Sequence, residues 1–298
     1  MFNCRNAFSR IIARFLPDKL YLSIKYRVHM GYWMDWNDPK TYNEKLQWLK
    51  VYYRRKDFSE MVDKLAAKEY VAKKIGYDYI IPSIAVYNSV EEIDFSKLPD
   101  KFVLKCTHDS GGLVVCSDKS KLDENLVKRK LEKALKASYV VQNREYPYAD
   151  VPHKIIAETF MEESEFGELR DFKFYCFDGR PQYILVVSGR QKKQKKFDYF
   201  DMDWNHLPVY DEGCPNNDIR PQKPKNFEGM IDIAKKLSKG IPHVRVDLYN
   251  INGKIYFGEF TFFDGSGINV YVPREYDAIF GKFISLPRPM NEYLKQKK

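Results

Sequence analysis

The segment VRVDLYNINGKIYFGEFTF, residues 244–262, constrains the fold more than any other part of this 298-residue chain. Two alternating runs flank an Asn-Gly pair, a pattern that predicts a β-hairpin. One arm carries Arg245 and Asp247, and the other carries Glu259 and Thr261. Two carboxylates and a cation on a half-buried sheet face cost desolvation energy unless something binds there. A divalent metal ion that carries phosphates would be such a partner.

The turn of this hairpin decides whether the four side chains lie on one face, because residues two apart in a strand point the same way. A two-residue turn at Asn252-Gly253 would place Glu259 on the face opposite to Asp247. A three-residue loop over residues 251–253, with Gly253 in the left-handed conformation, would align all four. We predict the three-residue loop. The alternative interpretation is a hairpin whose acids simply face solvent.

The composition is that of a soluble globular protein, with 44% hydrophobic and 31% charged residues. No apolar run approaches the roughly 18 residues that cross a bilayer, and residues 1–16 lack the apolar core and cleavage site of a signal peptide. Five scattered cysteines without zinc-type spacing favour a reducing compartment over a disulfide framework. We therefore expect a cytoplasmic protein.

The net charge of +9 is unevenly distributed. Residues 1–30 contain one acid, Asp18, and six basic residues: Arg5, Arg10, Arg14, Lys19, Lys25 and Arg27. Interleaved apolar residues predict a basic amphipathic helix, which either covers the body of the protein, the interpretation we favour, or lies on the inner face of the plasma membrane. A second basic cluster, at 189–196, is either a solvated loop or an attractor for a polyanionic substrate. No motif supports nucleic-acid binding.

Strands and helices alternate irregularly along the chain, which favours the α+β class. Two amphipathic helices are expected between residues 38 and 75, with others at 121–139 and 227–239. Strands are expected at 79–87, 102–108, 113–117, 154–160, 171–190 and 196–204.

A lysine at a strand end, next to a glycine loop, gives the second chemical signal. Lys105 ends the apolar strand FVLK, six residues before Gly111 in the loop Asp-Ser-Gly-Gly. Such a lysine can reach phosphates while loop N–H groups wrap them. The spacing is not that of the GxxxxGK[ST] phosphate loop, and a simple hairpin turn is the alternative. His108 adjoins the loop and is either catalytic or structural.

Four features, taken in chain order, closely resemble the ATP-grasp superfamily: DKLAAK at 63–68, FVLK with its SGG loop, IIAETF, and RVD followed by GEFT. The resemblance covers about residues 60–270. PKTYNEKLQWLK and GEFTFFDGSG are similar to one branch in particular, the TupA-like group. That group is named for teichuronopeptide synthesis and is associated with bacterial surface polysaccharide assembly.

The resemblance implies an α+β, ATP-grasp fold in which two subdomains hold the nucleotide and the distal hairpin holds magnesium. The expected parts are a helical N-terminal region over 1–75, a small subdomain with a glycine-rich lid over 76–157, and a large subdomain over 158–298. Lys64 and Lys105 resemble the lysines that hold ATP phosphates. The lid would consist of Ser110, Gly111 and Gly112.

Other roles follow from the same resemblance. Backbone groups of Ile156, Ala157 and Glu158 would read the adenine edge, with Phe160 packed nearby. Asp171 would bind the ribose, and the alternatives for this role are Glu162, Glu165 and Glu168. Lys173 shares a strand face with Asp171 and would reach the phosphates.

The hairpin residues correspond to the catalytic end of the family's site. Arg245 resembles the residue that steadies the reacting acyl phosphate, a catalytic role shared with Lys105. Asp247 and Glu259 resemble magnesium ligands. The family's last strand usually reads Glu-x-Asn, whereas Thr261 stands here. A threonine hydroxyl can offer oxygen to magnesium directly, act through water, or mark a site with one metal ion.

The function implied is an ATP-dependent carboxylate–amine ligase that uses ATP and Mg²⁺, works through an acyl phosphate and forms an amide. The expected substrates are a sugar acid or polysaccharide precursor and an amine or amino acid, for capsule, O-antigen or a teichuronopeptide-like polymer. One alternative is a glycosyltransferase, in which the triplet Asp201-Met202-Asp203 would hold a metal and a nucleotide sugar. Another is a non-catalytic scaffold of an assembly complex.

Overall fold

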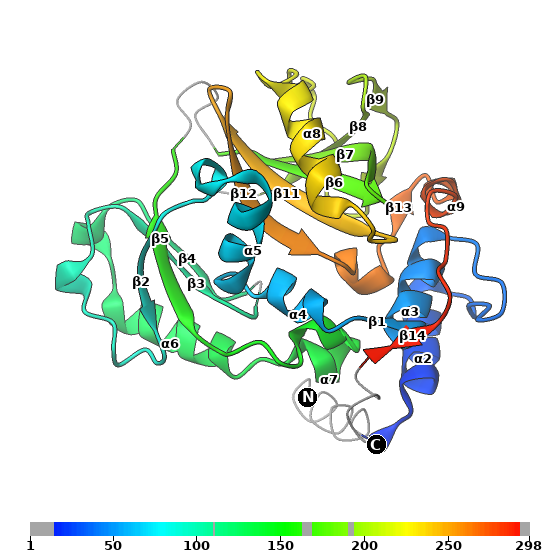
Figure 1. Cartoon of the computed structure of the whole chain (residues 1–298), viewed down its shortest axis with the longest axis horizontal. Coiled ribbons are helices and arrows are strands. Elements are labelled where there is room, and N and C mark those ends of the chain that lie inside the picture. Colours follow the sequence, from blue (N-terminus) through cyan, green and yellow to red (C-terminus); the bar gives the residue numbers. More distant parts are fainter. Residues whose placement is uncertain (1–14, 110, 163–168, 190–193, 293–298) are drawn as a thin grey trace.

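Two antiparallel sheets form the framework of this protein, and helices pack against them and between them (Figure 1). The computed structural model describes residues 15–109, 111–162, 169–189 and 194–292. Helices and strands are mixed along these residues, which confirms the expected α+β class. The predicted strands and the helices beyond residue 75 are present with somewhat shorter bounds.

The smaller sheet has the strand order β2-β5-β3-β4. Its strands are β2 (Ser83–Tyr87), β3 (Phe102–Cys106), β4 (Leu113–Cys116) and β5 (Ile155–Thr159). On one face, Phe102 and Leu104 pack with Leu131 of helix α6 (Glu124–Leu135) in a buried cluster. The opposite face carries Lys105 and Glu158, because successive side chains of a strand alternate between faces.

The larger sheet has the strand order β12-β11-β6-β7-β8-β9. Its strands are β6 (Asp171–Phe177), β7 (Arg180–Ser188), β8 (Lys196–Asp201), β9 (His206–Leu207), β11 (Val244–Ile251) and β12 (Lys254–Thr261). Helix α8 (Phe227–Ser238) covers the apolar face, where the rings of Phe174 and Phe227 lie 5.9 Å apart. The second face is charged on β6, β11 and β12 and aromatic on β7 and β8.

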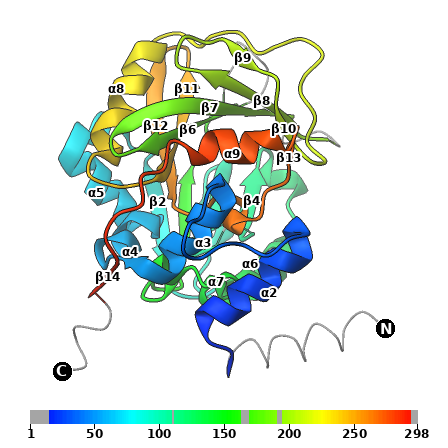
Figure 2. The ribbon, with the colours of Figure 1, turned by 90° about the vertical axis from the view of Figure 1, so that its right-hand side faces the viewer.

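Helices from the two ends of the chain cover the aromatic part of that second face (Figure 2). Tyr42 of α3 (Tyr42–Tyr52) meets Tyr175 of β6 edge-on at 6.2 Å, and Phe280 of α9 (Glu275–Gly281) stacks on Tyr183 of β7 at 4.0 Å. A capping box formed by Thr41 and Glu44 fixes the start of α3. Helix α3, from the N-terminal part of the chain, therefore packs in the core beside the larger sheet.

Three helices replace the two expected between residues 38 and 75: α3, α4 (Asp57–Val62) and α5 (Ala66–Ile75). The first break follows α3, where β1 (Tyr53–Arg54) pairs in parallel with β14 (Met290–Asn291). The second break comes at Asp63, whose side chain accepts a hydrogen bond from the backbone of Leu65 at 2.9 Å. A further short pair joins β10 (Tyr210–Asp211) to β13 (Tyr271–Val272).

The turn of the distal hairpin differs from our prediction. Ile251 pairs with Lys254, so the turn consists of Asn252 and Gly253 alone, with φ of 55° and 94°. The predicted three-residue loop is therefore wrong. An Asn-Gly pair with positive φ at both positions suits the twist of a two-residue hairpin, which explains the preference for this tighter turn.

A β-bulge at Gly258 restores the alignment that the three-residue loop was expected to provide. Leu248 pairs with Phe257, whereas Asp247 pairs with Glu259, which leaves Gly258 as the extra residue. The bulge shifts the rest of β12 by one position. The charged and hydroxyl side chains of the hairpin therefore lie on one face, as predicted.

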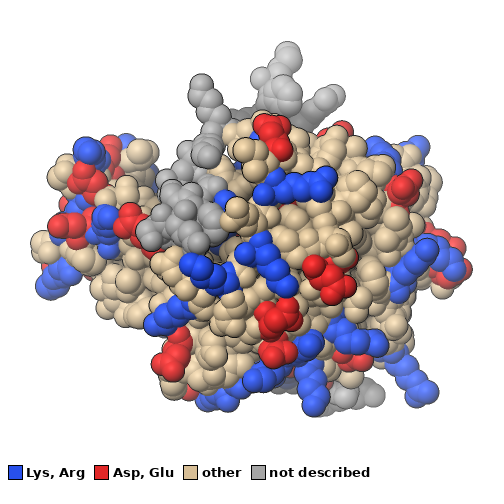
Figure 3. All heavy atoms as spheres, turned by 90° about the horizontal axis from the view of Figure 1, so that it is seen from above, with Lys and Arg blue, Asp and Glu red and all other residues tan. Residues whose placement is uncertain are grey.

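The positive net charge is not concentrated on the face seen from above. Figure 3 shows Lys and Arg side chains there interspersed with Asp and Glu and with uncharged surface. This mixture is typical of a solvated face and differs from the basic stripe that marks a nucleic-acid footprint. Among the helices of the described residues, none combines the length and the apolar character needed to cross a membrane.

The bulge predicts a specific sensitivity at Gly258. A Cβ at this position would lie 3.0 Å from the backbone oxygen of Asp247 and 3.2 Å from Cε2 of Tyr249. We expect Gly258→Ala to lower the free energy of unfolding by about 1–3 kcal/mol, measured by urea titration, because the ladder must shift to make room. The exposed control Lys254→Ala should change it by less than about 0.5 kcal/mol. Equal stabilities of the two variants would contradict the prediction.

Candidate active site

The polar face of the distal hairpin continues onto β6. Arg245 lies opposite Thr261 and Asp247 lies opposite Glu259, and on its other side Asp247 lies opposite Lys173. Residues opposite each other in an antiparallel ladder point to the same face, so three neighbouring strands present these groups together. The structure thus brings the residues predicted for the metal and the acyl phosphate together with Lys173, one of the lysines predicted to reach the phosphates.

Arg245 lies at the centre of this group and is only 8% exposed. Its Nε donates to Oδ1 of Asp247 at 2.7 Å, and its Nη2 donates to Oδ2 at 2.9 Å. Nη2 also donates to the Thr261 hydroxyl at 3.0 Å, and Nη1 donates to Asp264. A buried guanidinium needs such partners, because the loss of hydration is otherwise uncompensated.

Asp247 is held by two cations. Besides the two-point pairing with Arg245, it accepts a hydrogen bond from Nζ of Lys173, which also lies 3.8 Å from the carboxylate of the buried Asp171. Burial alone would raise the pKa of Asp247, but Arg245 and Lys173 outweigh burial and lower that pKa below its ordinary value. Asp247 is therefore ionised at neutral pH.

Asp264 is a site residue that the sequence reasoning missed. It is buried, and besides Arg245 it accepts hydrogen bonds from the Tyr175 hydroxyl at 2.7 Å and from Nδ2 of Asn269 at 2.8 Å. It follows β12 within GEFTFFDGSG, so the motif offered a signal. The spacing alone did not show that the chain after Thr261 turns the next carboxylate back toward Arg245.

The loop after β12 is held in place by α3. Gly265, Ser266 and Gly267 all have positive φ, between 50° and 65°. Nε2 of the buried Gln47 donates to the carbonyl oxygens of Ser266 at 2.8 Å and Gly267 at 2.7 Å, and Nζ of the buried Lys50 donates to that of Ser266 at 2.9 Å. A Cβ at Gly267 would lie 2.7 Å from Nε2 of Gln47, so glycine is required there. The two segments that carry the TupA-like resemblance therefore meet in space.

Lys64 connects the two sheets. Its Nζ donates to the backbone oxygen of Asp109, in the loop after β3, at 2.8 Å and lies 3.7 Å from Oε2 of Glu259 on β12. The Glu259 side chain is 35% exposed, and its other cationic neighbour, Arg245, is 3.9 Å away. Glu259 is thus the most accessible carboxylate of the hairpin face.

Glu158 is bound by two lysines on the smaller sheet. Its Oε1 lies 2.7 Å from Nζ of Lys68, and its Oε2 lies 2.6 Å from Nζ of Lys105. Burial would raise the pKa of Glu158, but Lys105 and Lys68 outweigh burial and lower it. The sequence interpretation missed Lys68, although this residue ends the DKLAAK motif four residues after Lys64. Lys68 lies in the first turn of α5, whereas Lys64 lies in the turn that precedes this helix.

The residues predicted to read the adenine edge lie on β5, an interior strand of the smaller sheet. Ile156, Ala157 and Glu158 pair with β2 on one side and with β3 on the other. Their backbone groups therefore lie within the sheet ladder, and the adenine contact remains a prediction. Ile156 and Glu158 share one face of the strand, where the Glu158 carboxylate meets two lysines. Phe160 follows the strand, half-buried, with Nζ of Lys101 5.7 Å from its ring.

The glycine loop is anchored at Gly112. Its N–H donates to Oδ2 of Asp109 at 2.7 Å, and a Cβ there would lie 2.5 Å from Sγ of Cys106. Gly111 is exposed, and Ser110 lies outside the described residues. The lid role of the loop remains a prediction.

Two further residues considered in the sequence analysis, His108 and Glu162, contact neighbouring side chains. His108 is buried with its ring stacked on that of His153 at 3.6 Å, and burial together with His153 lowers the pKa of His108 to about 4. Glu162 pairs with Lys101 at 2.9 Å on the surface. The other two ribose alternatives, Glu165 and Glu168, lie outside the described residues.

The predicted metal ligands are hard oxygen donors, as magnesium prefers. Glu259 is accessible, and Thr261 adds a hydroxyl, but the Asp247 oxygens are engaged by Arg245 and Lys173. Within the described residues, no group of three or more His, Cys, Asp or Glu side chains is placed to hold a metal ion. The donor set therefore fits magnesium in its chemistry, provided that Asp247 exchanges a partner.

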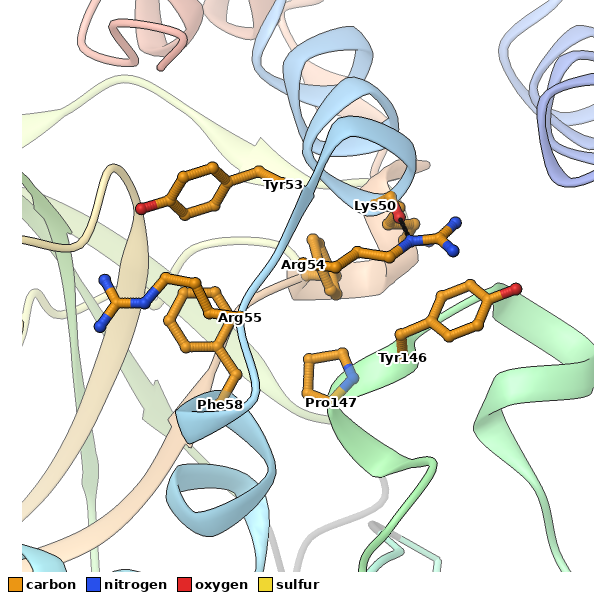
Figure 4. Close-up of a pocket in the computed structure, with 8 residues that line it drawn as sticks. Lys50, Tyr53, Arg54, Arg55, Phe58, Tyr146 and Pro147 are labelled. Atoms are coloured by element: carbon orange, nitrogen blue, oxygen red, sulfur yellow. Dashed lines mark hydrogen bonds between the residues drawn. The ribbon is translucent and has the colours of Figure 1, made fainter. Parts of the chain in front are cut away.

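A small, partly open pocket lies beside the junction of α3 and α4 (Figure 4). Arg54 crosses it, with its guanidinium 3.6 Å from the ring centre of Tyr146 and paired with Asp18 at 2.7 Å. None of the predicted site residues lines this pocket. Its lining consists of Lys50, Tyr53, Arg54, Arg55, Phe58, Tyr146, Pro147 and Phe263.

Comparison with known protein families agrees with the order of these features. Residues 44–285 match the sequence profile of the TupA-like ATP-grasp family. The chain belongs to this family. The resemblance inferred from the sequence is thereby confirmed, and with it the ATP-grasp class of the fold. No curated protein matches the sequence.

Solved structures of ATP-grasp ligases are similar at low identity. The D-alanine–D-alanine ligase of Bacillus anthracis complexed with ATP is 16% identical, with a TM-score of 0.38 over 68% of this chain and 54% of that one. The enzyme of Helicobacter pylori is 15% identical, with a TM-score of 0.39 over 76% and 61%. The ligase PsnB with its minimal precursor, Mg and ADP is 12% identical, with a TM-score of 0.38 over 75% and 60%. The TupA-like chain thus spans between half and two thirds of these proteins.

The stability of the TupA-like chain should depend on Asp264. Replacing Asp264 with Asn removes one carboxylate from buried Arg245, so we expect the free energy of unfolding to fall by about 1.5–3 kcal/mol in urea titrations. Glu132→Gln breaks an exposed pair with Lys136 and should cost less than about 0.5 kcal/mol. A loss no larger than that of the control would mean that Asp264 does not support Arg245.

The pairing of Glu158 predicts a pH dependence. Because the folded protein lowers the pKa of Glu158 below its ordinary 4.5, the pairs stabilise the fold above that pH, and the contribution disappears as the pH falls through the folded pKa. Glu158→Gln should therefore be less stable than wild type at neutral pH, and the difference should shrink in acid. Urea titrations across this range measure it. A difference independent of pH would be inconsistent with ionised Glu158 as the source.

Proposed function

We propose that the protein is an ATP-dependent carboxylate–amine ligase. The observation that supports this best is the convergence of cationic side chains from both sheets and from the segment between them. Lys64, which contacts the loop after β3 and the carboxylate of Glu259, joins the two halves into one site. Such a concentration of cations and acids suits phosphoryl transfer, in which the protein chiefly positions groups and stabilises charge.

The charges of this site balance one another. Five cations face five carboxyl groups: Lys64, Lys68, Lys105, Lys173 and Arg245 against Glu158, Asp171, Asp247, Glu259 and Asp264. A triphosphate brings several further negative charges, so ATP would bind together with magnesium. Asp247, Glu259 and Thr261 would hold the metal, which would neutralise phosphate charge.

In the proposed reaction, an oxygen of the substrate carboxylate attacks the γ-phosphorus of ATP, and the bond to the ADP oxygen breaks. The amine then attacks the carbonyl carbon of the acyl phosphate, releasing phosphate and leaving an amide. Lys64 and Lys105 would hold phosphate oxygens, with Lys173 reaching them from the larger sheet. Lys68, beside Lys105, would add a further cation, and Arg245 would stabilise the acyl phosphate. Closure of the loop at Gly111 would exclude water from the intermediate.

The proposal for the substrates rests on family membership alone. We propose a sugar acid or polysaccharide precursor and an amine or amino acid, joined during assembly of a bacterial surface polymer in the cytoplasm. The three-part division at residues 75 and 157 likewise remains a proposal.

The glycosyltransferase alternative loses its main support. Oδ1 of Asp201 accepts hydrogen bonds from the backbone N–H groups of Asp203 at 3.0 Å and Asn205 at 2.7 Å, and Oδ2 accepts one from Nδ2 of Asn205. The Asp201-Met202-Asp203 triplet therefore has a structural role in the turn after β8.

Calorimetric titration with ATP and magnesium tests the proposal. We expect magnesium-dependent binding that weakens about tenfold or more in Lys105→Met, because a charge-assisted contact to phosphate is lost. Lys136→Met, at an exposed lysine directly after α6, is the matched control and should bind as wild type does. With a panel of sugar acids and amino acids, ADP release should require both substrates and should be lost in Glu259→Gln.

Two outcomes would contradict this function. Sugar transfer from a nucleotide sugar that is lost in Asp201→Ala but kept in Glu259→Ala would establish the glycosyltransferase. Undetectable ATP binding in the presence of magnesium, by a folded protein, would favour the scaffold.

A further inference from the structure

Helix α2 (Asp18–Met30) covers the body of the protein with one of its faces. Leu22, Tyr26 and Met30 are buried there, and the last two form a cluster with Met34. This agrees with the favoured interpretation of the basic N-terminal helix for the part that the structure describes. Residues 1–14 lie outside that part.

The opposite face of α2 is also apolar but uncovered. Leu20, Ile24 and Val28 recur every four residues, so they form one stripe, and they are 48%, 43% and 73% exposed. Phe15 precedes the stripe at 83% exposure, and Trp33 follows it at 62%. The helix lies at the lower edge of the described part of the molecule in Figures 1 and 2, outside both sheets.

This concentration of exposed apolar groups is unusual within the molecule. Six of the fifteen exposed large hydrophobic side chains among the described residues fall between residues 15 and 33. Single exposed apolar residues are ordinary in globular proteins, whereas contiguous patches mark contact surfaces.

The same segment is basic on its outside. Lys19 and Arg27 are exposed, whereas Asp18, the only acid between residues 15 and 33, pairs with Arg54 at 2.7 Å and Arg144 at 2.8 Å. The acid is thus paired with the body of the protein. The two cations make neutral contacts only, Lys19 with the ring of Trp36 and Arg27 with the backbone oxygen of Gly31, among the described residues.

We propose that this stripe docks on an anionic lipid surface. Leu20, Ile24 and Val28 enter the interface between headgroups and acyl chains, Lys19 and Arg27 contact the headgroups, and Trp33 anchors the end. An apolar helix face with flanking cations and an aromatic residue is the combination that favours this interface. A second copy of the chain fits less well, because it would bring Lys19 and Arg27 of the two copies close together.

Co-sedimentation of the full chain with vesicles tests the proposal independently of any ligase activity. We expect binding to phosphatidylcholine vesicles that contain phosphatidylglycerol, weaker binding at high salt, and little binding to phosphatidylcholine alone. The pair Leu20→Ser/Val28→Ser should lower the partition coefficient about tenfold or more. The pair Val115→Ser/Ile219→Ser, at sites 47% and 89% exposed elsewhere, is the matched control and should not change it.

A variant that lacks two cations of α2 measures the electrostatic contribution to vesicle binding. Lys19→Gln/Arg27→Gln should lower binding to the anionic vesicles by at least about fivefold. Thermal unfolding at the wild-type temperature shows that each variant is folded. Absence of binding to anionic vesicles, or binding that the Leu20→Ser/Val28→Ser pair leaves unchanged, would overturn the proposal. A dimer in solution that the same pair dissociates would assign the stripe to a second copy instead.

Discussion

The buried guanidinium of Arg245 is the interaction on which the rest of the site depends. Burying a charge is unfavourable unless partners replace its water, and removing one partner leaves the other uncompensated. One of its carboxylates, Asp247, comes from the same strand. The other, Asp264, comes from a loop with three positive φ angles, and that loop keeps its shape because Gln47 and Lys50 bind its carbonyl oxygens. Helix α3, far away in sequence, thereby supports the loop that carries Asp264, and the family match includes all but the first residues of this helix.

The hairpin shows how far alternation in the sequence can predict a fold. The pattern of polar residues required one extra residue somewhere between Asp247 and Glu259, because only then do both acids share a face. The pattern could not say where. A three-residue loop and a β-bulge in the strand would each supply the one extra residue. The residue types decide between them. Asn252-Gly253 favours a two-residue turn, and Gly258, which lacks a side chain, forms the bulge. The shared face was predictable, and the means of achieving it was not.

The pairing of long side chains was harder to predict than their presence. Lys64 and Lys68 lie four residues apart in DKLAAK, and the sequence gives no reason to prefer either as the partner of Glu158. The packing of α5 and of the turn before it decides that Lys68 reaches Glu158 while Lys64 reaches toward Glu259. The order of strands within the sheet was equally difficult to predict. A run such as IIAET has the same pattern in an edge strand and in an interior strand, and only the structure shows that β5 is paired on both sides.

The balance of five cations and five carboxyl groups has a consequence for the proposed ligase. Each lysine that would bind phosphate already contacts a carboxylate, so nucleotide binding would exchange partners instead of filling an empty cationic pocket. If Lys173 turned from Asp247 to a phosphate oxygen, that carboxylate would lose one of its two cations and keep the other, Arg245. One lone pair of the carboxylate would then be available to a metal ion, so nucleotide and metal would favour each other's binding. The internal ion pairs also keep the lysines extended toward the site before substrate arrives, which reduces the side-chain entropy lost on binding.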